Sequence, residues 1–318
     1  MPTRARSASC LVLASSLALS LACQRSKPHP EAFDPAAHRA EVEAWRAERD
    51  EDLRSPDGWL ALTGLFWLRE GDNRFGGAAA NDLVFPGTGV PGTIGVLHRA
   101  EDKVTLKLTP GVALAADGTL ITVPELPLAA DADGKPTVLT LGTLTFYVIR
   151  RGERVGVRLK DAASPVLTGF EGVEAFPIDP AWRIEARFEP YQPPKKIRIP
   201  NVLGDVSEED CPGALVFERD GKTLRLEPTG EGDGRMFLVF GDTTNGHETY
   251  GGGRFLAVPA PAADGTVIVD FNRAYNPPCV FTPYATCPLP PRQNRLSIAV
   301  EAGDKMYAKG IAHAADAL

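Results

Sequence analysis

The residues best suited to chemistry gather in one stretch near the carboxyl end, DFNRAYNPPCVFTPYATCPLPPRQNRL, residues 270–296. Guanidinium, carboxylate, amide and phenol groups together are typical of a pocket that orients a polar or anionic small molecule between aromatic walls. Six prolines in the stretch favour a stiff loop that would hold such a site ready. The candidate ligand-binding residues are Arg254, Asp270, Asn272, Arg273, Asn276 and Tyr284, with Tyr275 as a further aromatic wall.

Asp270 ends an apolar row of residues, and two interpretations of it stay open. A carboxylate at that position needs a partner, and Arg254 on a neighbouring strand or Arg273 could supply two parallel hydrogen bonds. In the first interpretation this pair is a structural salt bridge that pins the loop, while the asparagines bond unpaired backbone groups. In the second, the same residues form the ligand pocket.

Catalysis is an alternative to simple binding. Asp270 or His247 could act as the base of a hydrolase, with Arg254 stabilising developing negative charge. A histidine beside Asn-Gly is also typical of a turn, and HETYG lacks the second histidine of the HExxH zinc helix. The sequence contains no GxSxG elbow, which disfavours a serine hydrolase of the α/β kind, and no GxGxxG that links a strand to a helix as a dinucleotide site requires. We expect no cofactor and no metal. A third hypothesis is a non-catalytic structural or assembly module whose proline loop contacts another protein.

Two cysteines of the loop are candidates for a disulfide. Seven residues separate Cys279 from Cys287, and in an oxidising compartment their bond would stabilise the fold by about 2.5 kcal/mol. Two buried thiols are the alternative. Neither CxxC nor HxH occurs, which argues against zinc, and Cys211 is left over as a buried residue.

The amino terminus reads as an export signal. Two arginines precede a charge-free run at residues 11–22, which as a helix reaches about 18 Å against a hydrocarbon core of about 30 Å. It is too short to span a membrane, so residues 1–22 are predicted to be a signal peptide. The ending LSLAC resembles the bacterial lipoprotein box, although Ser20 stands where Leu is more usual, and makes Cys23 the candidate lipidation site.

These features predict a location and a tether. We expect a lipoprotein of the cell envelope, on the periplasmic face of a bacterial membrane and held there by an acyl anchor at Cys23, with a secreted protein as the alternative. Residues 23–35 would be a polar tether. The formal charge of −7 and the short basic cluster at residues 195–198 offer nothing attractive to nucleic acid, so no nucleic-acid partner is expected.

One helix and many strands must position the candidate site. Residues 36–54 contain neither Gly nor Pro, and Val42, Trp45, Arg49 and Leu53 recur at helical spacing, so we expect a helix over 36–55 that docks on a domain surface. After it the periodicity changes to two, and six Asp-Gly pairs punctuate the chain as hairpin turns require. The expected strands are 82–85, 94–98, 103–108, 119–123, 137–149, 154–159, 183–188, 214–219, 222–226, 236–240, 254–258, 266–271 and 295–300.

This pattern predicts a mainly β protein of two sandwich- or barrel-like units rich in hairpins. At 318 residues the chain is long enough for two domains, which we place at 56–162 and 175–306, followed by a tail at 307–318. FGGAAANDLVFP, residues 75–86, is similar to the opening of forkhead-associated sandwiches. The Gly-Arg pair and Ser-x-x-His motif that read phosphothreonine in that family are absent here, so only the shape would carry over.

Several longer motifs resemble one bacterial and archaeal family. They are YGGGRFLAVP, VDFNRAYNPPCVFTPYATCPLPPRQNRL and AGDK, with GWLALTGLFWLREGDNRFG and RVGVRLKD upstream. Together they resemble the family known as domain of unknown function 1684, over roughly residues 45–305. Asp304 stands where Glu is usual before Lys305, a conservative departure. The resemblance implies kinship alone, because the family comes with no assigned activity, cofactor or catalytic residue.

Overall fold

The computed structural model describes residues 33–230 and 234–307. The predicted signal peptide at 1–22, the lipidation site Cys23, most of the tether at 23–35 and all but the first residue of the tail at 307–318 lie outside the described residues.

Helix α1 (Pro35–Leu53) forms where the sequence predicts one helix. Proline is favoured at the first position of a helix, and the Ala, Glu and Arg residues that follow are strong helix formers. Its buried residues, His38, Val42 and Leu53, lie on one face. Within the part of the chain that is described, no helix is both long and apolar enough to cross a membrane.

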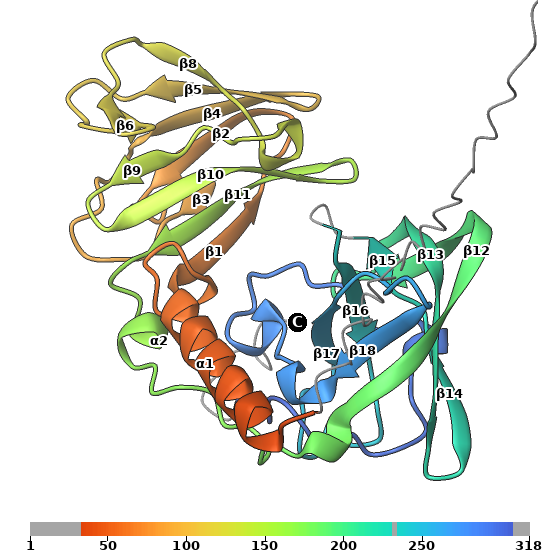
Figure 1. The fold of residues 1–318 in the computed structure, drawn as a ribbon. Helices are drawn as coiled ribbons and strands as arrows, with labels where there is room; N and C mark the ends of the chain where they lie inside the picture. The colour runs from red at the N-terminus through yellow and green to blue at the C-terminus, as the bar shows by residue number, and fades with distance from the viewer. Residues whose placement is uncertain (1–32, 231–233, 308–318) are drawn as a thin grey trace, which may run out of the picture. The chain divides into compact units, whose positions relative to one another are not determined.

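β-Strands supply most of the remaining regular structure, as the alternation predicted (Figure 1). A six-stranded sheet has the order β1-β11-β10-β9-β6-β7, and a five-stranded sheet has the order β3-β2-β4-β5-β8. Their bounds are β1 (Leu62–Trp67), β2 (Gly71–Gly76), β3 (Leu83–Val84), β4 (Gly95–Ala100), β5 (Lys103–Leu108), β6 (Ala115–Ala116), β7 (Thr119–Leu120), β8 (Glu125–Leu128), β9 (Leu139–Leu141), β10 (Leu144–Arg151) and β11 (Arg154–Asp161).

Two further sheets follow in the second half of the chain. A four-stranded sheet has the order β14-β13-β12-β18, and a three-stranded sheet has the order β15-β16-β17. Their bounds are β12 (Arg183–Pro200), β13 (Val206–Arg219), β14 (Lys222–Leu226), β15 (Thr229–Gly230), β16 (Met236–Phe240), β17 (Arg254–Val258) and β18 (Thr266–Asp270). The short helix α2 is Pro165–Thr168, and the 3-10 turns are η1 (Trp59–Ala61), η2 (Asp131–Asp133), η3 (Pro180–Trp182), η4 (Phe271–Arg273), η5 (Pro278–Val280) and η6 (Arg292–Asn294).

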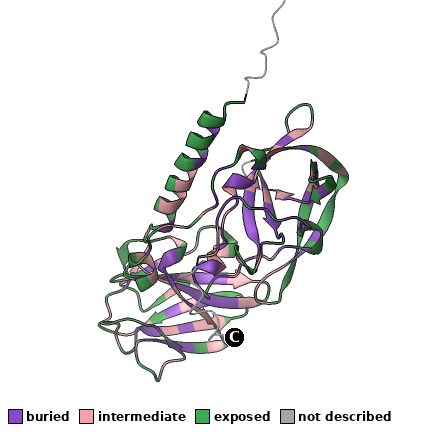
Figure 2. Ribbon diagram, turned by 90° about the horizontal axis from the view of Figure 1, so that it is seen from below, coloured by how far each residue is buried: buried purple, intermediate pink, exposed green. Residues whose placement is uncertain are grey.

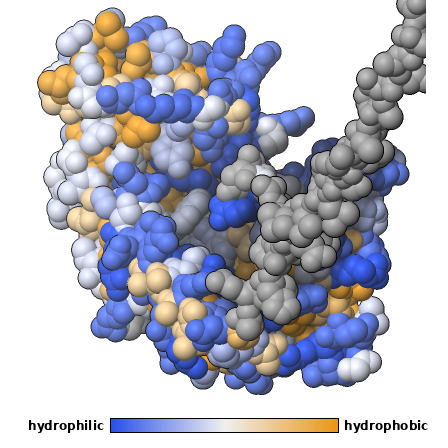
Figure 3. Space-filling model, viewed as in Figure 1, coloured by the Kyte–Doolittle hydropathy of each residue, from blue (hydrophilic) through white to orange (hydrophobic). Residues whose placement is uncertain are grey.

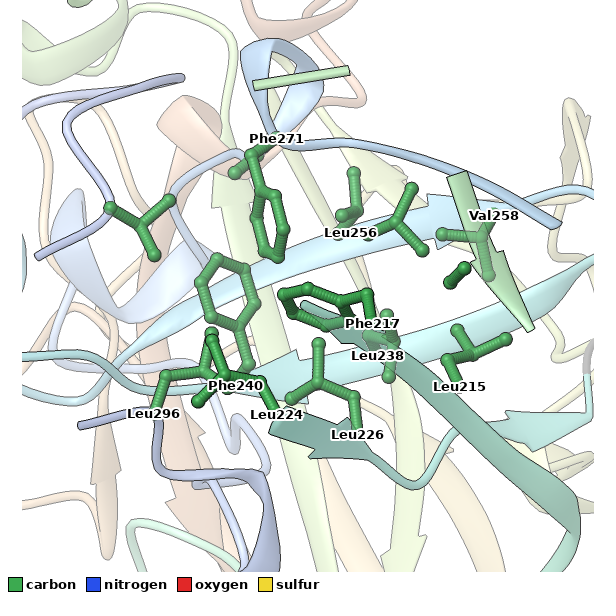
Figure 4. Close-up of a cluster of buried hydrophobic side chains, with 14 of the residues drawn as sticks. Leu215, Phe217, Leu224, Leu226, Leu238, Phe240, Leu256, Val258, Phe271 and Leu296 are labelled. Atoms are coloured by element: carbon green, nitrogen blue, oxygen red, sulfur yellow. The ribbon is translucent and has the colours of Figure 1, made fainter. Parts of the chain in front are cut away.

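Each pair of sheets shares a hydrophobic cluster. The five- and six-stranded sheets both contribute to one cluster, in which the rings of Phe75, Phe85 and Phe146 meet at centroid distances of 5.1–5.8 Å. Strands of the other two sheets contribute to a second cluster, with Phe271 pointing toward Phe240 and Phe217 (Figure 4). Figure 2 shows buried residues along many of these strands and exposed residues along much of α1. The domain boundaries at 56–162 and 175–306 stay a prediction.

The Asp-Gly turns form two hairpins of the expected kind. At Asp220 and Gly221 φ is 52° and 70°, and the turn joins β13 to β14. At Asp117 and Gly118 φ is 46° and 78°, and the turn joins β6 to β7. A two-residue turn with both φ angles positive matches the twist of the flanking strands, and Asp-Gly is one of the pairs that adopts it readily.

The structure differs from the expected strands in several places. Strands β1, β2, β6, β8 and β15 were not expected, the expected strand 137–149 divides into β9 and β10, and the expected strand 119–123 is only the short β7. Residues 295–300 form no strand, although their side chains alternate between exposed and buried; Arg295 makes only an isolated bridge to Gly241. In the other direction, β12 and β13 run far beyond the predicted 183–188 and 214–219. The two strands pair first up to Pro190 of β12, and the register shifts between Pro190 and Lys195. Beyond the shift, Lys195–Pro200 of β12 pairs with Val206–Cys211 of β13, so both strands continue.

Candidate functional site

A cleft of about 860 Å³ lies between α1 and the second pair of sheets. Helix α1 contributes residues spaced three or four apart, which is the spacing that puts them on one face of a helix. The opposite side comes from β12, β17, β18, η4 and the segment before β16. The lining residues are His38, Glu41, Trp45, Glu48, Arg49, Asp52, Arg183, Arg235, Ala257, Val258, Pro259, Ile268, Asp270, Arg273 and Tyr275.

Two arginines hold α1 against the loop that follows β18. Arg46 donates from Nη1 and Nη2 to the carbonyl of Phe176 at 3.2 Å, and from Nη2 to the carbonyl of Asn272 at 3.2 Å. Arg49 donates to the carbonyl of Asn276 at 3.0 Å and lies 3.5 Å from Asp304. Burial lowers the pKa of Arg46, while Asp304 and Asp270 counteract that shift. These contacts make the helix the fixed wall of the cleft.

Asp270 forms the polar centre of the cleft. Its Oδ2 lies 2.8 Å from His38 Nε2 and 3.8 Å from Arg273 Nε, and its Oδ1 accepts from the backbone and side-chain nitrogens of Asn272 at 3.1 and 2.9 Å. The carboxylate side chain is only 12% exposed. Four polar contacts therefore fix its orientation toward the helix.

The two walls of the cleft carry opposite charge. The sheet side holds Arg183, Arg235 and Arg273 against Asp270. The helix side holds three acids, Glu41, Glu48 and Asp52, against Arg49. Arg273 reaches across to Glu41, with Nη2 and Oε2 3.4 Å apart. A molecule in the cleft would meet an excess of guanidinium groups on one side and of carboxylates on the other.

Aromatic rings line the space between these charges. Trp45 and Tyr275 lie with centroids 6.2 Å apart, and the Arg49 guanidinium stacks 4.5 Å from the Tyr275 ring. Such rings offer apolar area and a π face to a ligand. Hydrophobic residues on the face shown in Figure 3 gather mainly over its upper part, where β5, β6 and β8 lie in Figure 1.

The predicted pairing of Arg254 with Asp270 is wrong. Arg254 is fully buried, and its carboxylate partner is Asp242, with Nη2 and Oδ2 2.9 Å apart. Arg254 Nη2 also donates to the carbonyl of Val300 at 2.8 Å, and Nη1 donates to the carbonyls of Asp304 at 3.3 Å and of Ala302. Burial lowers the pKa of Arg254 and the Asp242 carboxylate opposes this. The guanidinium thus joins β17 to the carboxyl-terminal segment and does not line the cleft.

The other predicted site residues divide between the cleft and the interior. Asp270 and Arg273 line the cleft. Asn272 is fully buried and bonds both the N–H and the carbonyl of Asp179, each at 2.9 Å. Asn276 is 1% exposed and bonds the carbonyl of Lys305 at 2.7 Å. Tyr284 is 36% exposed and is not among the residues of the cleft.

His247 lies on an exposed turn outside the cleft. Its N–H donates to the carbonyl of Thr244 at 3.1 Å. The neighbouring polar side chains bond one another: Thr244 Oγ1 donates to Asp242 at 2.6 Å, and Asn245 donates to Thr249 at 2.8 Å. This turn therefore supports the buried Asp242 and brings no histidine to the candidate site.

The two loop cysteines are neighbours but are not bonded. Cys211, Cys279 and Cys287 are all free thiols. The backbone N–H of Cys279 donates to Cys287 Sγ at 3.2 Å, so the sequence spacing brings the predicted pair together while the disulfide itself is not formed. Across residues 33–230 and 234–307, no three His, Cys, Asp or Glu side chains cluster as a metal site would require.

Sequence reasoning missed the helix side of the site. His38, Trp45 and Arg49 lie more than 200 residues from the loop they contact, and only the spacing of Trp45 and Arg49 on one helical face pointed to docking. Arg183 and Arg235 carried no sequence signal, because isolated arginines at strand ends are common on any surface.

Comparison with known proteins concerns the carboxyl-terminal part of the chain. A family model described as "Protein of unknown function (DUF1684)" matches residues 168–305, which begins later than the residue 45 suggested by the motifs. The solution NMR structure of the uncharacterized protein from gene locus rrnAC0354 of Haloarcula marismortui is 30% identical, over 43% of this chain and 78% of that chain, with a TM-score of 0.37. No curated protein matches the chain.

Proposed function

The chain belongs to the family described as protein of unknown function DUF1684, so its activity has to be argued from its own residues, and we propose that the cleft beside α1 binds a small polar molecule carrying an anionic group. The observation that carries this proposal is the wall of Arg183, Arg235 and Arg273 around a cleft of about 860 Å³. That volume is within the range of small-molecule sites, about 300–1,000 Å³.

The walls also favour a particular charge pattern in the ligand. Guanidinium groups recognise carboxylate and phosphate oxygens through paired hydrogen bonds. The acids of α1 would meet a cationic or hydrogen-donating end of the same molecule, and Trp45 with Tyr275 would cover its apolar part. A zwitterion with one ring or short apolar segment fits this arrangement best.

Binding should depend on the sheet-side arginines. We expect a matching ligand at 100 times its dissociation constant to stabilise the protein by about 2.7 kcal/mol. Arg273→Gln and Arg183→Gln should each weaken binding by about tenfold or more, because each removes a charge-assisted contact. Thermal unfolding against small envelope metabolites, comparing zwitterionic, anionic and neutral compounds of equal size, measures this.

A matched control is available on the same strand as Arg183. Arg187 lies four residues along β12, is 67% exposed and is not part of the cleft, so Arg187→Gln should bind as the wild type does. Equal loss of binding in all three variants would contradict the proposal, as would a screen in which neutral compounds stabilise as strongly as charged ones.

Hydrolysis of the bound molecule is a second candidate function, favoured by the contact between His38 and Asp270. A carboxylate beside an imidazole holds its orientation and stabilises the imidazolium form, which suits a general base. In that candidate, His38→Gln should lower turnover by about 10²-fold or more while ligand-induced stabilisation persists. His247→Gln is the control and should leave turnover unchanged; loss of turnover in His247→Gln alone would sink the assignment to His38.

We also propose that the protein acts in the cell envelope, anchored through an acylated Cys23. The support is the charge-free run at 11–22 and its LSLAC ending. The polar tether at 23–35 would separate this anchor from the folded part of the chain. A forkhead-associated-like sandwich in residues 56–162 remains a further proposal, supported by FGGAAANDLVFP and carrying no phosphothreonine binding.

A further inference from the structure

The paired thiols of the proline loop differ in their accessibility. Cys279 is half-buried at the start of η5, whereas Cys287 is 5% exposed. The two are linked by the hydrogen bond from the Cys279 N–H to Cys287 Sγ, and they pack in one cluster with Leu62 and Phe255. An accessible thiol beside a shielded one is the arrangement that permits attack by the first and resolution by the second.

Among residues 33–230 and 234–307, Arg158 on β11 is a buried cation that forms no ion pair. Its side chain is 4% exposed, it stacks 5.3 Å from the Trp59 ring, and its Nε has no hydrogen-bond partner. None of the ion pairs among the described residues includes Arg158. The Arg158 charge lowers the pKa of Asp131, but the Asp131 carboxylate forms its ion pair with Arg151, at 2.8 Å. A buried guanidinium that forms no close ion pair and leaves its Nε without a hydrogen bond favours a further negative charge nearby.

Strand β1 links Arg158 to the two thiols. Leu65 of β1 pairs with Arg158, while Leu62 of β1 packs in the cysteine cluster. The Leu62 carbonyl also accepts a hydrogen bond from Thr282 Oγ1 at 3.0 Å, which ties the loop between the cysteines to the same strand. Strand β1 therefore borders both the strand that carries Arg158 and the cluster that holds the two thiols.

The charges around the pair favour a thiolate at Cys279. A hydrogen bond between the two thiol side chains lowers the pKa of Cys279, against the effect of burial, and the Arg158 charge lowers it further. The same hydrogen bond and deeper burial raise the pKa of Cys287. Burial and the charges of both sulfurs raise the pKa of Tyr250 to about 12, so this neighbouring phenol stays neutral.

We propose that Cys279 and Cys287 form a redox-active dithiol that exchanges with small disulfides, with Arg158 as the positioning residue for the Cys279 thiolate. The Cys279 thiolate attacks one sulfur of a disulfide R–S–S–R, which breaks that S–S bond and releases one thiolate to take up a proton. The Cys287 thiol then loses its proton and attacks Cys279 Sγ, expelling the second R–S⁻. In sum, two protein thiols are oxidised to a disulfide and one small disulfide is reduced to two thiols.

Glutathione disulfide is the probe for the reduced full-length protein. Acid quenching, alkylation and peptide mapping by mass spectrometry should locate a disulfide between Cys279 and Cys287. Cys287→Ser should accumulate a mixed disulfide on Cys279, Cys279→Ser should accumulate little on Cys287, and Cys211→Ser should behave as the wild type, since Cys211 is fully buried. Equal trapping on either cysteine, or no oxidation at all, overturns the proposal.

The role of Arg158 is tested by a pH profile that a merely structural residue would not move. Arg158→Met should raise the pH midpoint of Cys279 alkylation and slow alkylation at neutral pH by about three- to tenfold, because losing the nearby positive charge raises the pKa of Cys279 and leaves less thiolate. Arg154→Met is the control, because Arg154 lies on the same strand and stacks on Trp67 at 5.0 Å but is 38% exposed. An unchanged profile in Arg158→Met removes Arg158 from the site.

Reversibility separates this proposal from a permanent structural disulfide. Millimolar reduced glutathione should return the oxidised protein to the dithiol, since exchange sites have potentials near that of glutathione. A disulfide that resists this treatment overturns the redox cycle in favour of a fixed crosslink.

Discussion

Arg254→Met is expected to lower the free energy of unfolding by about 3–5 kcal/mol, the range for breaking a buried ion pair by removing one partner. The guanidinium is fully buried against Asp242 and also satisfies carbonyls of the carboxyl-terminal segment, including Val300 at 2.8 Å. Methionine fills a similar volume but leaves the Asp242 carboxylate buried without its cation. Urea denaturation of the two proteins measures the difference.

An exposed ion pair provides the control for this substitution. Lys196 and Asp210 lie 2.9 Å apart with side chains 59% and 66% exposed, so Lys196→Met should change stability by less than about 1 kcal/mol. Adding Asp242→Leu to Arg254→Met should recover part of the loss, because the uncompensated carboxylate is then gone. If Arg254→Met leaves stability unchanged yet abolishes ligand-induced stabilisation, the arginine belongs to a ligand site as the sequence suggested.

Phe271→Ala should have an effect of similar size, about 3–5 kcal/mol, through lost burial and the cavity that remains. Phe271 is fully buried, and its ring centroid lies 5.4 Å from Phe240 and 6.0 Å from both Trp182 and Phe217 (Figure 4). It sits between Asp270 and Asn272, so this ring anchors the start of the loop to the core. Chemical denaturation gives the stability change.

Phe271→Leu keeps most of the buried volume and should lose only about 1 kcal/mol. Because the neighbouring Asp270 faces the cleft, Phe271→Ala should also weaken binding there in protein that is still folded, while Phe271→Leu should not. A loss below about 1 kcal/mol in Phe271→Ala would mean that the loop is not held by this ring.

The sequence predicted those helices, strands and turns whose signal lies within a few consecutive residues. Helix α1 and strands β16 and β17 follow from residue type and alternation, and the Asp220-Gly221 turn follows from the two positive φ angles it needs. The alternation at 295–300 wrongly predicted a strand. Alternation shows which side chains are buried, but it does not show whether the backbone pairs with a neighbouring strand. The far halves of β12 and β13 were missed because their prolines and charges resemble a loop.

The sequence predicted only part of the candidate site, for a different reason. The sequence singled out Asp270 and Arg273 from their place at a strand end, and both line the cleft. It offered Arg254 or Arg273 as the partner of Asp270; Arg273 Nε lies 3.8 Å from Asp270 Oδ2, whereas the partner of Arg254 is the buried Asp242. Nothing local distinguishes two carboxylates that compete for one guanidinium; the distance and burial of each decide.

The sequence by itself determined the mainly β character, the helix at 35–53, the family and the closeness of Cys279 to Cys287, since each depends on residues near one another along the chain. Tertiary structure alone decided that His38 meets Asp270 across 232 positions and that Arg158 is buried without an ion pair to any described residue. Ion pairs and hydrogen bonds act over a few ångströms, so which charges find partners is settled only when packing brings distant segments together.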